Sequence, residues 1–203
     1  MSSRLKKIAI AGLVATIGYS IEATAEPVSQ YSSIAPDKCR QLTADEESGS
    51  VTFSCPGPAG IDVWVGEGDL RTFLAYGPEP RKQCAAQQTF GSFNTAGPTM
   101  EWRMADGAPF ATIIRYKMDS GNGKRFNFLV VTALRGGQTC HMAYVDGSLP
   151  RHNELARDIA DNQARQFNCA TDTPQLVTNR DYQLSHLVSG VPCGPDAAMK
   201  FQE

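Results

Sequence analysis

Residues 99–145 contain four runs in which large apolar side chains recur at every second position, and this pattern constrains the fold more than any other feature. A period of two is typical of strands with one buried face, so each run predicts a β-strand. The predicted strands are residues 99–104, 110–118, 125–134 and 140–145. We interpret them as an antiparallel meander.

The predicted meander has one aromatic core face to which all four strands contribute. Its members are Met100, Trp102, Met104, Phe110, Thr112, Ile114, Tyr116, Met118, Phe126, Phe128, Val130, Thr132, Leu134, Cys140, Met142 and Tyr144. A two-residue turn at Asp106-Gly107 would put Trp102 and Phe110 on different faces. We favour a loop with an odd number of residues, because burying these two side chains together, at about 1.5–3 kcal/mol each, outweighs the turn preference.

The second face of the predicted sheet divides into two halves. A charged half carries Glu101, Arg103, Arg115 and Lys117, and an apolar half carries Leu129, Val131, Ala143 and Val145. Residues 151–167 follow with an apolar stripe at helical spacing, formed by Leu155, Ala156, Ile159, Ala160, Ala164 and Phe167. This stripe predicts one main helix that covers the apolar half. We expect the charged half to face water, and the fold class to be α+β.

The first 25 residues have the pattern of a secretory signal peptide. Basic side chains precede an apolar run at residues 8–17, and Ala23-Thr24-Ala25 is a typical cleavage site. An uncleaved membrane anchor is the alternative, but the run is shorter than the roughly 20 residues that span a bilayer. We therefore predict a single exported domain at residues 26–203, periplasmic or secreted, without a stable membrane anchor. Its core spans about residues 31–169, and residues 170–203 form a C-terminal extension.

The charge balance argues against a nucleic-acid partner. The chain of 203 residues has 19 basic and 21 acidic side chains. Removal of the predicted signal peptide leaves 16 basic and 20 acidic side chains, a net charge of −4. A mildly acidic chain without a basic cluster lacks the electrostatic footprint of nucleic-acid binding.

All six cysteines follow the predicted signal peptide, and none forms a CxxC motif. An even number in an exported chain predicts disulfides. Cys39 and Cys55 flank a predicted hairpin, which would place them opposite each other. Cys140 starts a predicted strand and Cys169 follows the helix, so a bond between them would clamp the helix onto the sheet. Elimination leaves Cys84 with Cys193.

No strong catalytic or metal-binding motif is present, and we predict neither a cofactor nor a metal. His141, His152 and His186 are too scattered to form a metal pair. Residues 119–123 superficially resemble the start of a calcium loop but lack its acidic spacing and terminal Glu. A Gly- and Asn-rich hairpin connection explains this segment better.

Six side chains are candidates for a ligand or partner surface: Trp64, Glu67, Asp69, Glu101, Arg103 and Arg115. Trp64 lies on the opposite side of its predicted strand from Val63 and Val65, where an aromatic ring can anchor a partner. Packing beneath a loop is the alternative reading for Trp64. Glu67 and Asp69 share one turn, and a solvated turn is the simpler explanation for them.

Several sequence segments are similar to those of an uncharacterised family of small exported bacterial proteins with no established activity. They include WVGEGDLR at residues 64–71, FGSFNTAGPTMEWR at 90–103 and NELARDIAD at 153–161, and the resemblance covers about residues 31–169. It implies no catalytic residues. The four family cysteines match Cys39, Cys55, Cys140 and Cys169, which makes Cys84 and Cys193 additions.

Two functional hypotheses follow from the sequence. The first is a non-enzymatic binding or interaction protein of the bacterial envelope, whose partner is an unknown envelope protein or a small ligand. The second is an envelope hydrolase whose carboxylates, Glu67, Asp69 and Glu101, come together only in the fold.

Overall fold

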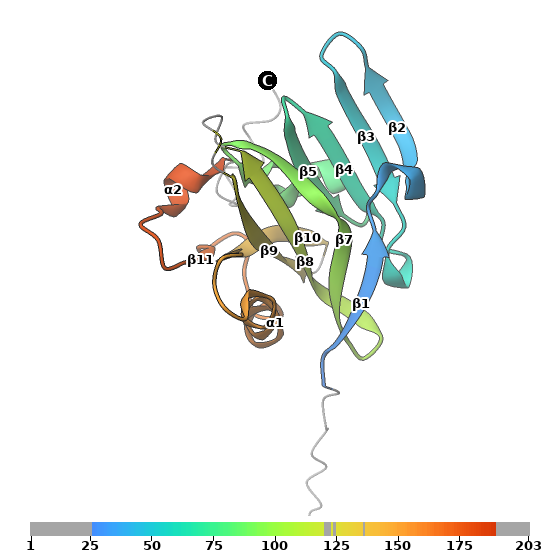
Figure 1. Cartoon of the computed structure of the whole chain (residues 1–203). Coiled ribbons are helices and arrows are strands. Elements are labelled where there is room, and N and C mark those ends of the chain that lie inside the picture. The colour runs from blue at the N-terminus through green and yellow to red at the C-terminus, as the bar shows by residue number, and fades with distance from the viewer. Residues whose placement is uncertain (1–25, 120–122, 124, 136, 190–203) are drawn as a thin grey trace, which may run out of the picture.

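A six-stranded sheet forms the centre of the molecule in the computed structural model, which describes residues 26–119, 123, 125–135 and 137–189. The predicted signal peptide at residues 1–25 lies outside the described residues. The strand order is β1-β7-β8-β9-β10-β11 (Figure 1). The strands are β1 (Val28–Ser33), β7 (Phe93–Ala105), β8 (Ala108–Asp119), β9 (Arg125–Arg135), β10 (Gln138–Asp146) and β11 (Gln175–Val177).

Two further sheets and one main helix complete the described structure. The four-stranded sheet contains β2 (Arg40–Asp45), β3 (Ser50–Cys55), β4 (Val63–Gly68) and β5 (Arg71–Tyr76). The small sheet pairs β6 (Thr89–Phe90) with β12 (Val188–Ser189). The helices are α1 (His152–Gln163) and the one-turn α2 (Leu184–Leu187), with short 3-10 turns at Pro36–Lys38, Pro58–Gly60, Pro80–Lys82 and Cys84–Gln87.

The predicted antiparallel meander is confirmed as β7 to β10, and the chain is mostly β-sheet with one main helix. The meander is, however, only part of a larger, mixed sheet. β1 adds an antiparallel edge strand beside β7, and β11 pairs in parallel with β10. The pairing of β2 to β5 into a separate sheet was not predicted.

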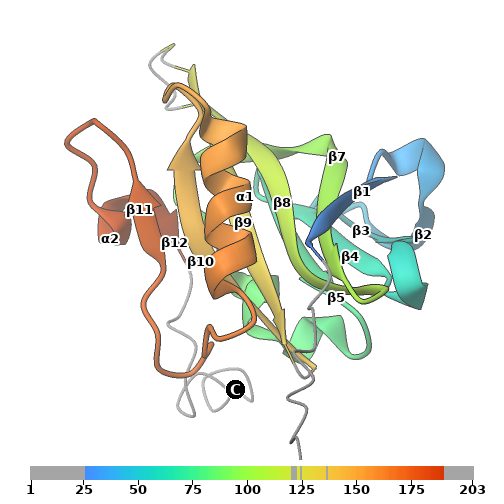
Figure 2. The same cartoon turned by 90° about the horizontal axis from the view of Figure 1, so that it is seen from below.

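The six-stranded sheet is covered on both faces. The four-stranded sheet packs on one face, and a core of aromatic and aliphatic side chains that includes Trp102, Tyr116 and Tyr144 fills the space between them. Helix α1 packs on the other face and runs along β8 to β10 (Figure 2). The cluster beneath the helix is rich in alanine: Ala111, Ala133, Ala143, Ala156, Ala160 and Ala164. Small side chains at facing positions let the helix lie close to the sheet.

The connection between β7 and β8 is a two-residue turn, so the predicted odd loop is wrong. Ala105 pairs with Ala108, and the turn residues Asp106 and Gly107 have positive φ angles of 51° and 77°. A β-bulge places Phe110 as the extra residue on β8 and so restores the register of the large side chains. Trp102 therefore stays in the core between the sheets, whereas Phe110 belongs to the cluster beneath α1.

A second bulge corrects the prediction for the fourth strand. The register shifts between His141, which pairs with Thr132, and Ala143, which pairs with Val131. The shift turns Cys140 and Met142 toward the cluster beneath α1, while the later Tyr144 remains in the core between the sheets. Strict alternation fails here because a bulge adds one residue to one strand.

Two of the three predicted disulfides are confirmed. Cys39–Cys55 joins the residue before β2 to the last residue of β3, with a Cα–Cα distance of 4.3 Å. Cys140–Cys169 links β10 to the segment after α1, with a Cα–Cα distance of 5.8 Å. The predicted bond between Cys84 and Cys193 stays a prediction, because Cys193 lies outside the described residues. Among the described helices, none has the length and apolar character needed to cross a membrane.

Candidate functional site

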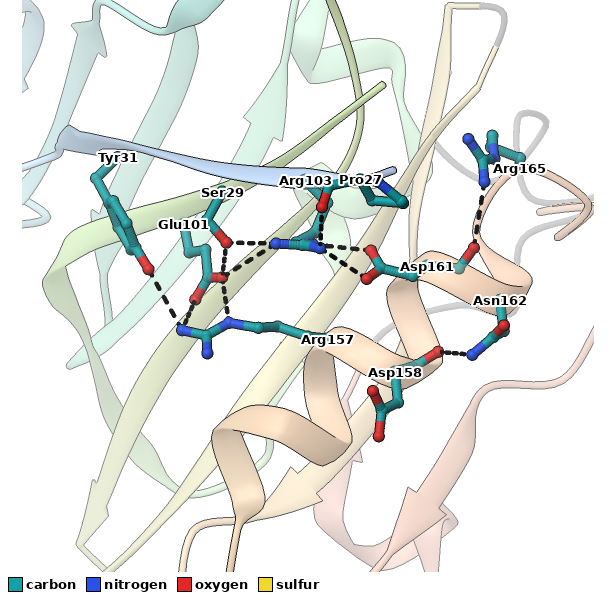
Figure 3. Close-up of polar contacts among 10 residues, drawn as sticks. All are labelled: Pro27, Ser29, Tyr31, Glu101, Arg103, Arg157, Asp158, Asp161, Asn162 and Arg165. Atoms are coloured by element: carbon teal, nitrogen blue, oxygen red, sulfur yellow. Dashed lines mark hydrogen bonds and ion pairs between the residues drawn. The ribbon is translucent and has the colours of Figure 1, made fainter. Parts of the chain in front are cut away.

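Glu101 and Arg103 lie on β7 and point away from the core between the sheets, as their alternation with Met100 and Trp102 requires. The expectation that they face water is wrong, because the two residues are only 9% and 6% exposed. The polar side of α1 covers this part of the sheet, and β1 flanks it as the edge strand (Figure 3). Lys117, further along β8, is exposed.

Glu101 and Arg103 belong to a network of hydrogen bonds and ion pairs that joins β1, β7 and α1 (Figure 3). The Arg103 guanidinium donates from Nε and Nη2 to the two carboxylate oxygens of Asp161, at 2.8 and 2.7 Å. It also donates to the Ser29 hydroxyl and to the carbonyl of Pro27. The bidentate bond to Asp161 fixes the plane of the guanidinium.

The second half of the network centres on Glu101. Arg157 of α1 donates to both of its carboxylate oxygens, at 2.6 and 3.2 Å, and to the hydroxyl of Tyr31 at 3.3 Å. The hydrogen bond to Glu101 raises the pKa of Arg157. Every charge in the network therefore has an opposite charge within the chain, which favours a structural role that holds β1 and α1 against the sheet.

Arg115 lies apart from this network. Its guanidinium donates to the side-chain oxygens of Asn127 and Asn153, the second at 3.0 Å, and burial lowers its pKa. A Cβ atom at Gly147 would lie 1.9 Å from the Asn127 oxygen, so a larger residue there would displace the Asn127 side chain from this cluster.

The three predicted carboxylates do not come together. Glu67 is in β4, and Asp69 is in the turn between β4 and β5, where it forms an ion pair with Arg71. Glu101 lies on β7 beneath α1, on the face of the six-stranded sheet opposite the core that β4 and β5 share with it (Figure 3). The core between the sheets therefore separates it from the other two, and a shared catalytic centre would need them on one side.

The structure also contains a concave site that the sequence did not indicate. It is a cavity of about 360 Å³ at the β10 side of the six-stranded sheet. Its walls come from separate parts of the chain and include Gln88, His141, Tyr144, Phe167, Leu184 and Ser185. The Cys140–Cys169 disulfide also lines it and joins two of those parts.

His141 is the titratable group best placed to act in this cavity. Its side chain is 2% exposed, and Nδ1 lies 2.9 Å from the hydroxyl of Tyr144. The backbone N–H of His141 donates to Oε1 of Gln88 at 2.7 Å, which holds the strand against the segment before β6. Within the described part of the chain, Nε2 makes no hydrogen bond with another residue.

Burial sets the protonation of this pair. It lowers the pKa of His141 to about 3 and raises the pKa of Tyr144, so both side chains are neutral near pH 7. A neutral imidazole carries one N–H donor and one acceptor nitrogen. Because Nδ1 is engaged by Tyr144, Nε2 can offer one hydrogen bond to a bound molecule. The sequence excluded His141 only from a metal pair and gave no sign of this cavity, since the bulge that positions the residue leaves no local pattern.

The remaining predicted candidate, Trp64, lies on the outer face of the four-stranded sheet. Its neighbours Val63 and Val65 are buried on the inner face, whereas Trp64 is half-buried. Across residues 26–189, apart from the undescribed positions, no three His, Cys, Asp or Glu side chains are grouped to hold a metal ion. Comparisons of the chain with protein-family models, curated proteins and solved structures find no match.

Proposed function

We propose that this protein is a non-enzymatic binding protein of the bacterial envelope that holds a small, uncharged and largely apolar ligand in the His141 cavity. The observation that carries the proposal is a cavity of about 360 Å³ with a buried, neutral His141–Tyr144 pair in its wall. Concave, mainly apolar sites with one or two placed polar groups are the usual form of small-molecule sites.

The chemistry of the walls selects the ligand. Tyr144, Phe167 and Leu184 supply apolar surface, and the ring of His141 supplies one hydrogen bond. A charged ligand would lose its hydration for little gain, because His141 is neutral near pH 7 and the acidic Asp172, which also lines the cavity, is itself exposed to water. The preferred ligand therefore has an apolar body and one neutral hydroxyl, carbonyl or N–H group.

Export to the periplasm or the medium is part of the proposal. It rests on the signal-peptide pattern and on the disulfides Cys39–Cys55 and Cys140–Cys169, since disulfides persist in oxidising compartments.

Titration with N-phenyl-1-naphthylamine, an uncharged fluorescent probe with one N–H group, tests the proposal. We expect saturable binding to the mature protein. Ser185→Phe should weaken it at least tenfold, because Ser185 lines the cavity and the new ring would occupy it. His186→Phe is the matched control, since His186 is the exposed next residue of α2 and does not line the cavity. An absence of saturable binding, or equal binding by Ser185→Phe, would refute the proposal.

A further inference from the structure

The indole of Trp64 lies along β4 on the outer face of the four-stranded sheet. A Cβ atom added to Gly66 would lie 2.4 Å from Cη2 of the indole and 2.9 Å from Cζ2. The six-membered ring therefore rests directly on the backbone of Gly66, a close approach that only glycine permits. This contact gives Trp64 a defined position on a rigid strand.

The cross-strand register places a second aromatic side chain next to it. Gly66 pairs with Phe73 on β5, so Phe73 is a diagonal neighbour of Trp64 on the same face. Both side chains are half-buried. The core of this sheet lies on its other face, with Val63, Val65 and Leu74, so neither ring belongs to that core.

Polar groups border the aromatic pair on the β3 and β2 side. Ser54 lies opposite Trp64 and donates to Oδ2 of Asp62 at 2.8 Å. Thr52 lies opposite Gly66, and its hydroxyl is 2.6 Å from that of Thr43.

Arg40 extends the same border. It lies opposite Ser54, is exposed, and forms no ion pair within the described part of the chain. The border therefore combines an exposed carboxylate, exposed hydroxyl groups and a guanidinium without an acidic partner.

We infer that this outer face is a glycan-binding site, with Trp64 as the platform for a hexopyranose ring. One side of a pyranose consists mainly of C–H bonds, whose positive hydrogens are attracted to the negative face of an indole. Its hydroxyl groups point outward from the ring, where they can donate to Asp62 and accept from Arg40. A ligand with one apolar face and a polar margin matches an aromatic platform with a polar border on one side.

The site is independent of the His141 cavity. The aromatic pair lies on β4 and β5, whereas the cavity is lined by β10 and by segments that follow α1. No residue of the glycan face lines the cavity, so either site can fail without the other.

Tryptophan fluorescence offers a direct test, because the chain has two tryptophans and Trp102 is fully buried. Titration of the mature protein with cellohexaose and chitohexaose should change the emission of Trp64 saturably and protect it from acrylamide quenching. Isothermal titration calorimetry gives the affinity of variants that lack this ring. We expect at least tenfold weaker binding for Trp64→Ala and for Gly66→Ala, whose new methyl group displaces the ring.

Phe93→Ala is the matched control, because Phe93 is an exposed aromatic residue on β7, which belongs to the six-stranded sheet and not to the four-stranded one. It should bind both oligosaccharides as tightly as the unmodified chain. Trp64→Phe, which keeps an aromatic ring, should retain partial affinity and shows whether a loss in Trp64→Ala reflects misfolding. N-Phenyl-1-naphthylamine binding should be unchanged in Trp64→Ala, which separates this inference from the proposed function.

Three results would overturn the inference. The first is an absence of saturable binding of either oligosaccharide at millimolar concentration. The second is undiminished affinity in Trp64→Ala. The third is a concentration-dependent self-association that Trp64→Ala abolishes, which would make this face an interface between two copies of the chain.

Discussion

The two faces of the six-stranded sheet are packed by different kinds of side chain. Between the sheets, Phe90 lies at the centre of an aromatic cluster, with ring centroids 5.4 Å from Tyr116 and 5.5 Å from Tyr144. Beneath α1, alanines from the sheet and the helix meet, and the ion pairs of Glu101 and Arg103 continue the contact toward β1.

The difference follows from what lies across each face. Two packed sheets are about 10 Å apart, so large side chains must fill the space between them. A helix that approaches through alanine leaves little space, and its apolar stripe is too narrow to reach β7 and β1 as well. Charged side chains make that remaining contact. The aromatic face should therefore be most sensitive to lost volume, and the helix face to added volume or lost charge.

The largest effect is expected at Trp102, which is fully buried, donates to the hydroxyl of Ser32 and lies edge-on to Tyr76. Trp102→Ala should lower the free energy of unfolding by about 3–5 kcal/mol, because it leaves a cavity between the sheets. Urea unfolding measures the change. Trp64→Ala, which removes a half-buried ring, should cost less than half as much. Equal losses of unfolding free energy in the two variants would show that the core between the sheets is no more sensitive to lost volume than the outer face.

The next largest effect concerns the charged contact on the helix face. Asp161→Ala should cost about 3 kcal/mol, because the buried guanidinium of Arg103 loses its bidentate partner. Asp158→Ala, at an exposed position of the same helix, should cost less than about 0.5 kcal/mol. Chemical unfolding of both variants gives the comparison. If Asp161→Ala behaved like its control, the network would not hold α1 to the sheet.

Added volume beneath the helix should have a somewhat smaller effect. Ala160→Leu should destabilise the fold by about 2 kcal/mol, since the fully buried Ala160 has no room for three more carbons. Asn162→Leu adds a similar side chain at an exposed position and should change stability little. Thermal unfolding of the two variants distinguishes the sites. Tolerance of leucine at both would mean that the alanine cluster is loosely packed.

The smallest predicted effect is a pH dependence of the free energy of unfolding, caused by His141 at the edge of the aromatic face. Because burial lowers the pKa of His141 from 6.5 to about 3, the unfolded chain takes up a proton below pH 6.5 and the folded chain does not. Stability should therefore fall by about 1 kcal/mol between pH 7 and pH 5.5 from this residue alone. His141→Gln should remove that component, and His186→Gln, at an exposed position, should keep it. An identical pH profile in all three proteins would contradict the assignment.

Much of the fold could be predicted from the sequence because it depends on local periodicity. The alternation from Met100 to Tyr144 predicted the meander, and the apolar stripe from Leu155 to Phe167 predicted the helix that covers it. The Cys39–Cys55 and Cys140–Cys169 bonds were predictable for the same reason, since local elements bring each pair together.

The predictions failed where one extra residue in a strand interrupts the alternation of side chains between the two faces of the sheet. One extra residue at Phe110, and another near His141, shifts the later side chains to the other face, and only cross-strand packing decides where such a bulge forms. The burial of Glu101 and Arg103 had a weak signal in the sequence. Arg157 and Asp161 are four residues apart and so lie on one side of the helix, with charges opposite to those on β7.

By itself, the sequence determined the strand and helix periods, two disulfides and the sign of the net charge, all of which depend on residue types and short spacings. Tertiary structure alone decided the assembly of β2 to β5 into a second sheet, the separation of Glu101 from Glu67 and Asp69, and the cavity beside His141. These features join segments far apart in the chain, such as Gln88 and Leu184. Their proximity depends on how whole sheets and helices pack, which no local pattern records.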